Sequence, residues 1–196
     1  TPKTQSALLE GMAERQVTIE NATHVLPQPF FVMATQNPLD LVGTYPLPDS
    51  QLDRFLLSFS LGYPDPAAER ELLISEDRIS MLARIQTLLS PEDIEALQND
   101  CEAIHASDNL LDYIQALLLE TRDERWFETG LSPRAGLALL KVSRAHAYLE
   151  DRDFVTPEDV KTVFPALARH RLSPTSGFSQ SPEEQIGELL DQVPIP

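Results

Sequence analysis

The chain has 196 residues, 42% of them hydrophobic, which is enough to bury one or two cores and argues against disorder. Fifteen basic residues against 31 acidic residues give a formal net charge of −16, which repels a phosphate backbone and argues against a dedicated nucleic-acid binder. No apolar run approaches the roughly 20 residues of a membrane span, and the first residues lack the pattern of a signal segment. The one cysteine, Cys101, permits no internal disulfide, as expected in a reducing cytoplasm.

The first part of the chain has the pattern of an α/β domain. A helix is expected over residues 2–14, followed by a hairpin over residues 16–26. The unbroken apolar runs at residues 30–34 and 55–61 are typical of strands that are buried on both faces of a parallel sheet. The short helical segment between them, residues 39–54, completes the strand–helix–strand pattern of such a sheet.

From residue 64 onward the pattern predicts a bundle of helices. Several of them are expected to begin with Ser, Thr or Asp as the N-cap and Pro as the first helical residue. These pairs are Asp65-Pro66, Ser90-Pro91, Ser132-Pro133, Thr156-Pro157 and Ser181-Pro182. Residues 172–182, rich in Pro, Ser and Gly, are expected to link the bundle to one last helix that ends near Val193.

An arginine at one of these helix starts is a candidate for ligand binding. The helices that begin after Ser90, Thr156 and Ser181 carry two acids in the first turn, which complement the helix dipole. The helix after Ser132 instead has Arg134 at its second position and no acid in its first turn. A guanidinium at a helix N-terminus makes a good phosphate site. The alternative is a solvated arginine, which costs only roughly a few tenths of a kcal/mol.

Two further candidates lie between the predicted strands. Asn37 follows the first apolar run, at the strand end where ligands bind in open α/β sheets. Its amide can hold a water in line with a γ-phosphate, or can simply form an Asx turn before Pro38. Arg54 ends the next helix, where a cation can serve phosphate chemistry or only complement the helix dipole. Its neighbour Asp53 is expected to be solvated or to pair with a nearby basic group.

Three motifs together resemble the MoxR family of AAA+ ATPases. They are ATQNP at residues 34–38, GTYPLPDSQLDRF at residues 43–55 and SPRA at residues 132–135, in the family's order and spacing. The resemblance extends from the PKTQ segment at the start of the chain to about Arg171. It implies that Asn37 is the sensor 1 residue and that Arg54 is an arginine finger, which reaches the nucleotide of the adjacent subunit. It implies that Arg134 is the sensor 2 residue, acting within its own subunit or across the interface.

The resemblance also implies a fold class, an α/β remnant of an AAA+ P-loop ATPase domain followed by an all-α helical lid bundle. Residues 1–63 would belong to the ATPase core, residues 64–171 to the lid, and residues 172–196 to a linker and terminal helix. The hairpin would be the family's pre-sensor-1 hairpin or only a sheet-edge hairpin. The chain has no GxxxxGK[ST] phosphate loop. In the family this loop and the acidic magnesium motif come earlier, so we interpret the chain as the C-terminal portion of a longer protein, separated by design or by proteolysis.

The implied function is that of a chaperone-like ATPase. The complete protein would use ATP and Mg²⁺ to remodel or mature client proteins, as a homo-oligomer expected to be a hexameric ring, with von Willebrand factor A domain proteins as partners. No nucleic acid, membrane or metal site is expected for this chain, whose four histidines are too scattered to form a ligand cluster. The chain alone is expected to be inactive. The alternatives are a related motor subunit, such as that of magnesium chelatase, and a non-catalytic helical adaptor that keeps ATPase-like motifs.

Overall fold

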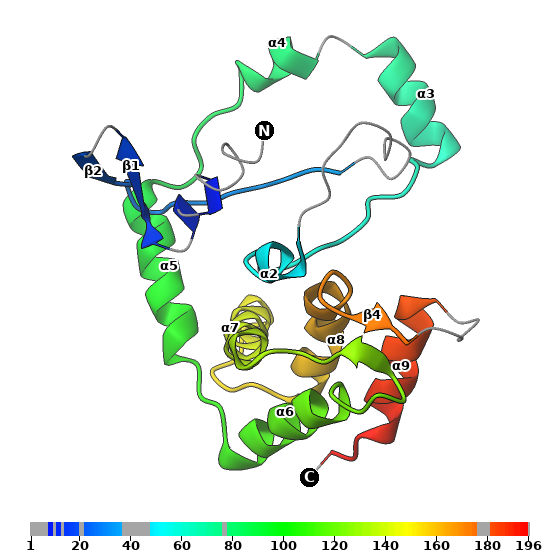
Figure 1. Ribbon diagram of the computed structural model, residues 1–196. Coiled ribbons are helices and arrows are strands. Elements are labelled where there is room, and N and C mark those ends of the chain that lie inside the picture. The colour runs from blue at the N-terminus through cyan, green and yellow to red at the C-terminus, as the bar shows by residue number, and fades with distance from the viewer. Residues whose placement is uncertain are drawn as a thin grey trace.

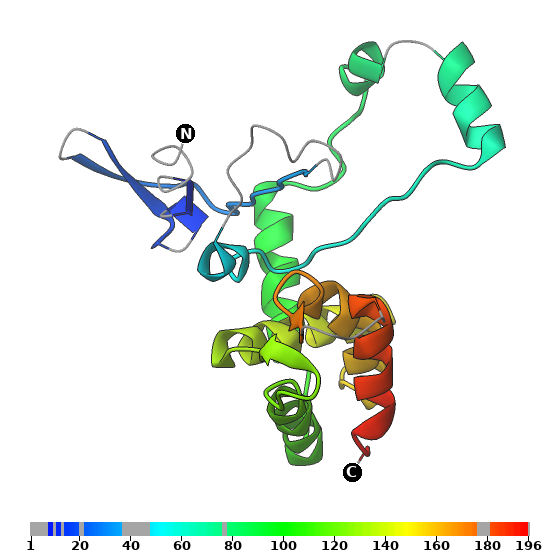
Figure 2. The ribbon, with the colours of Figure 1, turned by 45° about the vertical axis from the view of Figure 1, so that its right-hand side comes forward.

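Helices dominate the described part of the chain, as the computed structural model in Figure 1 shows. The structure describes residues 8–9, 11–12, 14–19, 22–36, 48–75, 78–175 and 181–195. The named elements, in chain order, are β1 (Gln16–Ile19), β2 (Ala22–Val25), α2 (Asp49–Leu52), α3 (Pro66–Ile74), α4 (Arg78–Leu82), α5 (Pro91–Ala103), α6 (Asp108–Glu120), β3 (Phe127–Thr129), α7 (Pro133–Leu149), α8 (Pro157–Ala168), β4 (Ser173–Pro174) and α9 (Pro182–Gln192). Helices α6 to α9 gather into one body, and the elements before α5 lie to one side of it (Figures 1 and 2).

The helix starts that depend on an N-cap followed by proline are all confirmed. Each cap side chain accepts a hydrogen bond from a backbone amide of the first turn, which would otherwise lack a partner. The caps are Asp65, Ser90, Ser132, Thr156 and Ser181. At Ser90, Thr156 and Ser181 an acid three residues later returns a bond to the cap amide and completes a capping box. Helix α6 has Ser107 as its N-cap and Asp108 as its first residue, so its start does not carry the N-cap and proline pattern.

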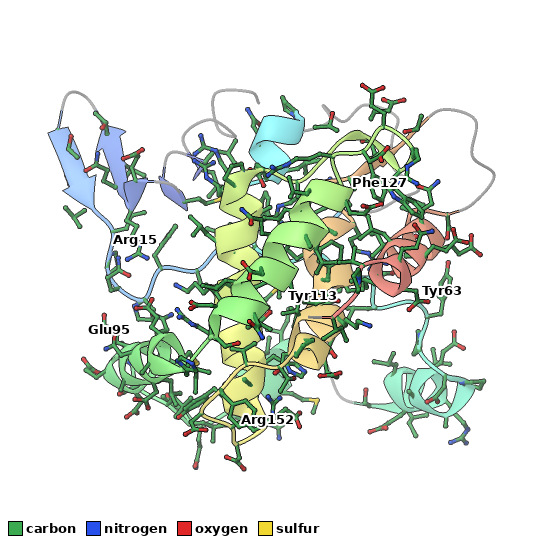
Figure 3. The ribbon with its side chains drawn as sticks, turned by 90° about the horizontal axis from the view of Figure 1, so that it is seen from below. Arg15, Tyr63, Glu95, Tyr113, Phe127 and Arg152 are labelled. Carbon is green, nitrogen blue, oxygen red and sulfur yellow. The ribbon has the colours of Figure 1, made fainter. Side chains whose placement is uncertain are left out.

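The core of the body lies between α6, α7, α8 and α9, and its central side chains are completely covered. These are Leu117, Leu139, Phe164, Leu167, Ile186 and Leu189, each with 0% of its surface exposed. Burial of each such side chain contributes about 1.5–3 kcal/mol relative to an exposed position. Figure 3 shows Tyr113 and Phe127 directed into this helical body, where both are buried. The terminal helix α9 therefore belongs to the same core as α6, α7 and α8.

A short sheet closes one end of this body. Strand β3 pairs with β4 in antiparallel fashion, with Phe127 opposite Pro174, and the Thr175 amide donates to the Trp126 carbonyl oxygen at 3.4 Å. Trp126 is itself 7% exposed, and its indole Nε1 donates to Glu120 at 2.8 Å. The burial of Trp126 and Phe127 therefore holds the turn after α6 against the core.

The N-terminal hairpin is present where the sequence predicts it. Strands β1 and β2 pair in antiparallel fashion with Gln16 opposite Val25 and Ile19 opposite Ala22. Leu8, Leu9 and the described residues up to Glu14 are helical, in agreement with the predicted first helix.

The two predicted buried strands are not formed, and this local prediction is wrong. Within the described residues the sheets are two antiparallel pairs, and neither residues 30–34 nor residues 55–61 take part in a ladder. Phe31 and Met33 are each 79% exposed and Leu61 is 90% exposed. The physical reason is that an apolar run becomes a central strand only when strands flank it and helices cover it, and no described element does so here. Residues 30–36 instead run as a single trace away from the hairpin (Figure 1).

Helices α3 and α4 lie far from the helical body in both views (Figures 1 and 2). Neither α3 nor α5 contains a completely buried residue, although α5 packs along α7. Leu73, Ile74, Ile79 and Leu82 are all more than half exposed. None of the described helices has the length and hydropathy needed to cross a bilayer.

Candidate functional site

The last residues of α2 and those that follow it are held against the helical body by a set of polar contacts. We call residues 51–58 the finger segment, because it contains Arg54. The amide of Ser58 donates to the carbonyl oxygen of Ala166 at 2.8 Å, near the end of α8. His170 Nε2 lies 2.9 Å from the carbonyl oxygen of Phe55. These contacts join residues that are more than a hundred positions apart in the chain.

Arg171 makes the most extensive of these contacts. Its Nε donates to Asp53 Oδ1 at 2.8 Å, and its Nη2 donates to the carbonyl oxygens of Asp53 at 3.2 Å and Phe55 at 2.6 Å. Its Nη1 donates to the carbonyl oxygens of Leu56 and Leu167. A guanidinium has five N–H donors in a planar fork, so this arginine is fully hydrogen-bonded. That matters because the side chain is 4% exposed, and a buried charge without partners is strongly destabilising.

Asp53 is the point where two parts of the helical body meet the finger segment. Its Oδ1 accepts from Arg171, and its Oδ2 accepts from the Ser132 hydroxyl at 3.2 Å. Ser132 is the N-cap of α7, so the carboxylate connects the start of α7 with the turn that follows α8. We call Asp53, Arg171 and Ser132 the clasp. The expectation that Asp53 is a solvated acid is wrong, whereas the alternative of pairing with a basic group is confirmed.

Arg54 points away from the clasp and toward the first helix. Its side chain is exposed, and its Nη1 donates to the carbonyl oxygen of Leu9 at 2.8 Å. Leu9 lies within that helix, whose last described helical residue is Glu14. Helix α2 itself ends at Leu52 and has no basic residue in its last turn. In this structure Arg54 therefore binds a backbone carbonyl group of a different helix from the one that precedes it.

Arg134 occupies the second position of α7, as predicted, and no acid follows in the first turn. The residue is exposed, and no described residue forms a hydrogen bond or ion pair with its guanidinium. The Ala135 amide is satisfied by the Ser132 hydroxyl at 3.2 Å. A guanidinium that no described residue binds, beside the positive end of a 17-residue helix, is an arrangement that favours an anion.

The three predicted site residues are thus only partly brought together. Arg54 and Arg134 are linked through their neighbours, since Asp53 and Ser132 share a hydrogen bond. Asn37 lies outside the described residues. Its neighbour Gln36 lines an open hollow of about 470 Å³, which is lined neither by Arg54 nor by Arg134. Residues 58–60, Arg169, His170 and the first residues of α9 form the other walls of this hollow.

Sequence reasoning missed the clasp and the contact of His170. Burial lowers the pKa of His170 below its ordinary value, the neighbouring Arg171 acts in the same direction, and the hydrogen bond with Phe55 opposes both. The signal that could have drawn attention to these residues is the Arg-His-Arg run at residues 169–171, directly after the last turn of a helix. Its acidic partner could not be identified from the sequence, because it lies 118 positions earlier.

A second charged cluster joins α7 to α8 and has a structural role. Asp159 is 1% exposed and is bonded to Arg152, to His146 Nδ1 at 2.7 Å and to the Thr156 amide at 2.7 Å. Burial alone would raise the pKa of Asp159, but the hydrogen bonds from Arg152, Thr156 and His146 hold it well below its usual range. Within the described part of the chain, no three His, Cys, Asp or Glu residues are placed so that they could hold a metal ion.

Two family models match parts of the chain. Residues 1–57 match the family described as "ATPase family associated with various cellular activities (AAA)", and residues 119–192 match the AAA lid domain. The chain is 39% identical over 199 residues to the uncharacterized protein YeaC of Bacillus subtilis (strain 168), covering 100% of this chain and 62% of that protein. It is 39% identical over 206 residues to Chaperone MoxR1 of Mycobacterium tuberculosis (strain ATCC 25618 / H37Rv), covering 99% of this chain and 54% of that protein.

A solved structure extends the likeness to three dimensions. The crystal structure of a candidate ATPase from Cytophaga hutchinsonii ATCC 33406 superimposes with a TM-score of 0.90 at 35% identity, covering 100% of this chain and 63% of that one. The chain therefore spans about half to two thirds of the length of these relatives.

The match to the ATPase family and the match to the lid domain define a part of an AAA+ ATPase. More narrowly, the chain belongs to the MoxR family of these ATPases. The expected fold class, part of the α/β ATPase domain followed by a helical lid, is confirmed by the same matches. The expected end of the likeness near Arg171 is wrong, because the match to the lid domain continues to residue 192 and α9 packs into the lid core.

Proposed function

We propose that the complete protein hydrolyses ATP and uses the energy to remodel or mature partner proteins. The family match supports the ATPase activity, and the relative named Chaperone MoxR1 supports the chaperone-like role. The single observation that carries the nucleotide assignment is the free guanidinium of Arg134 at the capped start of α7, where an anion is favoured by both charge and dipole.

The described residues fit a nucleotide phosphate and do not by themselves fit Mg²⁺. Arg134 would bind the phosphates in the ground state, from the lid side. Arg54 would stabilise charge that develops on the transferred phosphoryl group of an adjacent subunit. Asn37 would orient the attacking water. No described cluster of carboxylates is suited to the metal, so its ligands would come from outside the described residues.

A finger that acts on a neighbouring subunit requires an oligomer, and we propose a hexameric ring. Arg54 is exposed on the surface of this chain, as such a role requires, although it must first leave the Leu9 carbonyl oxygen. Partner proteins with von Willebrand factor A domains and a cytoplasmic location are part of the same proposal. The chain alone should be inactive, because its sequence contains no phosphate loop.

The domain division is also a proposal. The ATPase match over residues 1–57 supports an α/β part that ends near residue 63. The packing of α9 and the lid match to residue 192 support a lid that includes the terminal helix.

The experiment that tests the function is steady-state ATP hydrolysis by the complete protein and three variants. Arg54→Ala should lower kcat on the order of 10³-fold with little change in ATP affinity, because a finger acts mainly in the transition state. Arg134→Ala should raise the Kd for ATP as well as lower kcat. Arg125→Ala, on an exposed lid arginine that pairs with Asp123 and Glu120, is the matched control and should change neither.

Mixing subunits locates the finger. Arg54→Ala subunits combined with subunits disabled in their own magnesium site should recover part of the activity, since each supplies what the other lacks. A complete protein that shows no ATP hydrolysis, or in which Arg54→Ala behaves like Arg125→Ala, would contradict the proposed function and favour a non-catalytic adaptor.

A further inference from the structure

Arg54 is held in place by the lid of its own subunit. The backbone on its C-terminal side is bonded to the lid at Phe55, Leu56 and Ser58, by His170, Arg171 and the Ala166 carbonyl oxygen. The residue on its N-terminal side, Asp53, is bonded to the lid through both carboxylate oxygens. Bonds to the lid therefore fix the backbone both before and after Arg54.

The same contacts lead directly to Arg134. Ser132, which donates to Asp53, is the N-cap of α7, and Arg134 is the second residue of that helix. Neighbouring Cα atoms are about 3.8 Å apart, so Ser132 and Arg134 are close along the chain. A movement of the start of α7 that follows binding at Arg134 therefore also moves Ser132. Asp53 can follow that movement only together with Arg54.

The bonds of the clasp are strong enough to transmit such a movement. The Arg171 side chain is 4% exposed and that of Asp53 is 22% exposed, so their ion pair is shielded from solvent and from salt. Charge-assisted hydrogen bonds of this kind are about twice as strong as neutral ones. By contrast, the ion pair of Arg169 with Glu183 joins the end of α8 to α9 within the lid. Within the described part of the chain, neither of these side chains forms a hydrogen bond with the finger segment.

We propose that Asp53 and Arg171 are positioning residues that couple Arg54 to the nucleotide bound at Arg134. The nucleotide in one subunit thereby sets, through the lid and the clasp, where that subunit presents its Arg54 to the next. This coupling rests on the proposed ATPase function and adds to it a route by which one site controls its neighbour. It assigns a role to Asp53 and Arg171, which would act through Arg54 and not by binding a nucleotide themselves.

The first test is the ATPase kinetics of the complete protein with Asp53→Asn or Arg171→Lys. Both substitutions keep size and polarity but weaken the charged, fork-shaped contact. Misplacing a catalytic group by about an ångström can cost on the order of 10²-fold. We expect kcat to fall by about tenfold to a hundredfold, with the KM for ATP changed less than about twofold. Arg169→Lys and Glu183→Gln, in the matched ion pair, should leave both constants unchanged.

The second test separates positioning from general support of the fold. Asp53→Asn introduced into the Arg54→Ala protein should cause no further loss of kcat, because a residue that acts through Arg54 has nothing left to position. In the protein with Arg54 intact, Asp53→Glu keeps the carboxylate and should retain more activity than Asp53→Asn. If either variant shifts the thermal midpoint, the comparison within the Arg54→Ala background still decides, since a folding defect lowers kcat by the same factor in both backgrounds.

The outcomes distinguish the coupling from the function on which it rests. If Arg54→Ala has no effect on kcat, the proposed function fails. If Arg54→Ala lowers kcat while Asp53→Asn and Arg171→Lys match the Arg169 and Glu183 controls, the coupling is wrong and the function stands. An equal loss of kcat from Asp53→Asn with and without Arg54 would also overturn the coupling.

Discussion

The lid and the segments that precede it differ in what covers their apolar side chains. In the lid, leucines such as Leu139 and Leu189 are enclosed by neighbouring helices and are 0% exposed. In the preceding part, Leu61 and Leu73 are 90% and 81% exposed. Since both parts are rich in apolar residues, the difference lies in architecture: the lid brings its own second layer, whereas the apolar runs before it require a layer that no described element supplies. The finger segment is the exception, because the lid holds it.

The largest expected effect comes from a matched pair of leucines. Leu139→Ala should lower the free energy of unfolding of the lid by about 3–5 kcal/mol, through lost burial and the cavity that remains. Leu73→Ala should change it by less than about 0.5 kcal/mol, because the side chain is already in contact with solvent. Urea unfolding of the 196-residue chain, followed by Trp126 fluorescence, measures both. Equal effects would remove the contrast between the two regions.

The buried carboxylate in the lid should matter more than an exposed one. Asp159→Asn removes the charge that pairs with Arg152 and His146, and should cost about 2–3 kcal/mol of stability. Asp123→Asn alters an ion pair with Arg125 at the surface and should leave the unfolding midpoint unchanged. The same unfolding experiment checks both variants. A midpoint for Asp159→Asn equal to that of the unmodified chain would show that the α7–α8 connection does not depend on this cluster.

The comparison also shows which features a sequence can reveal. The helix starts at Ser90, Ser132 and Thr156 were predictable because an N-cap and the following proline act within a single turn. The absence of strands at residues 30–34 and 55–61 was not predictable. A strand depends on partners elsewhere in the chain, and an apolar run by itself does not say whether those partners are present.

The candidate site divides in the same way. Arg134 was recognisable because its local pattern departs from that of the other helix starts. The clasp was not, because Asp53 finds Arg171 only after the lid has folded and brought the two together. Arg54 could be singled out from its motif, but its contact with Leu9 could not.

A smaller effect is expected from pH at the junction of the two regions. The pKa of His170 is lowered by burial, so the unfolded chain binds the proton more tightly than the folded chain. The stability that the neutral side chain contributes is present above the ordinary value of about 6.5 and is lost as the pH falls below it. Asp53, Arg169 and Arg171 are the other charged groups that act on this ring. Urea unfolding at pH 7.5 and pH 5.5, chosen as about one unit either side of 6.5, should show a loss that His170→Gln reduces. A loss of stability of the same size in both proteins would show that His170 is not the group responsible for it.

The central claim, that the lid holds the segment carrying Arg54, is tested most directly by amide hydrogen exchange on the 196-residue chain. The Ser58 amide, bonded to the Ala166 carbonyl oxygen at 2.8 Å, should exchange as slowly as lid amides of moderate protection. Amides of residues 30–36 and of residues 61–63, which take part in no described ladder, should exchange rapidly. Arg171→Lys should accelerate exchange at Ser58 and leave α6 unchanged. Exchange at Ser58 as fast as at residues 61–63, or unaffected by Arg171→Lys, would contradict the claim.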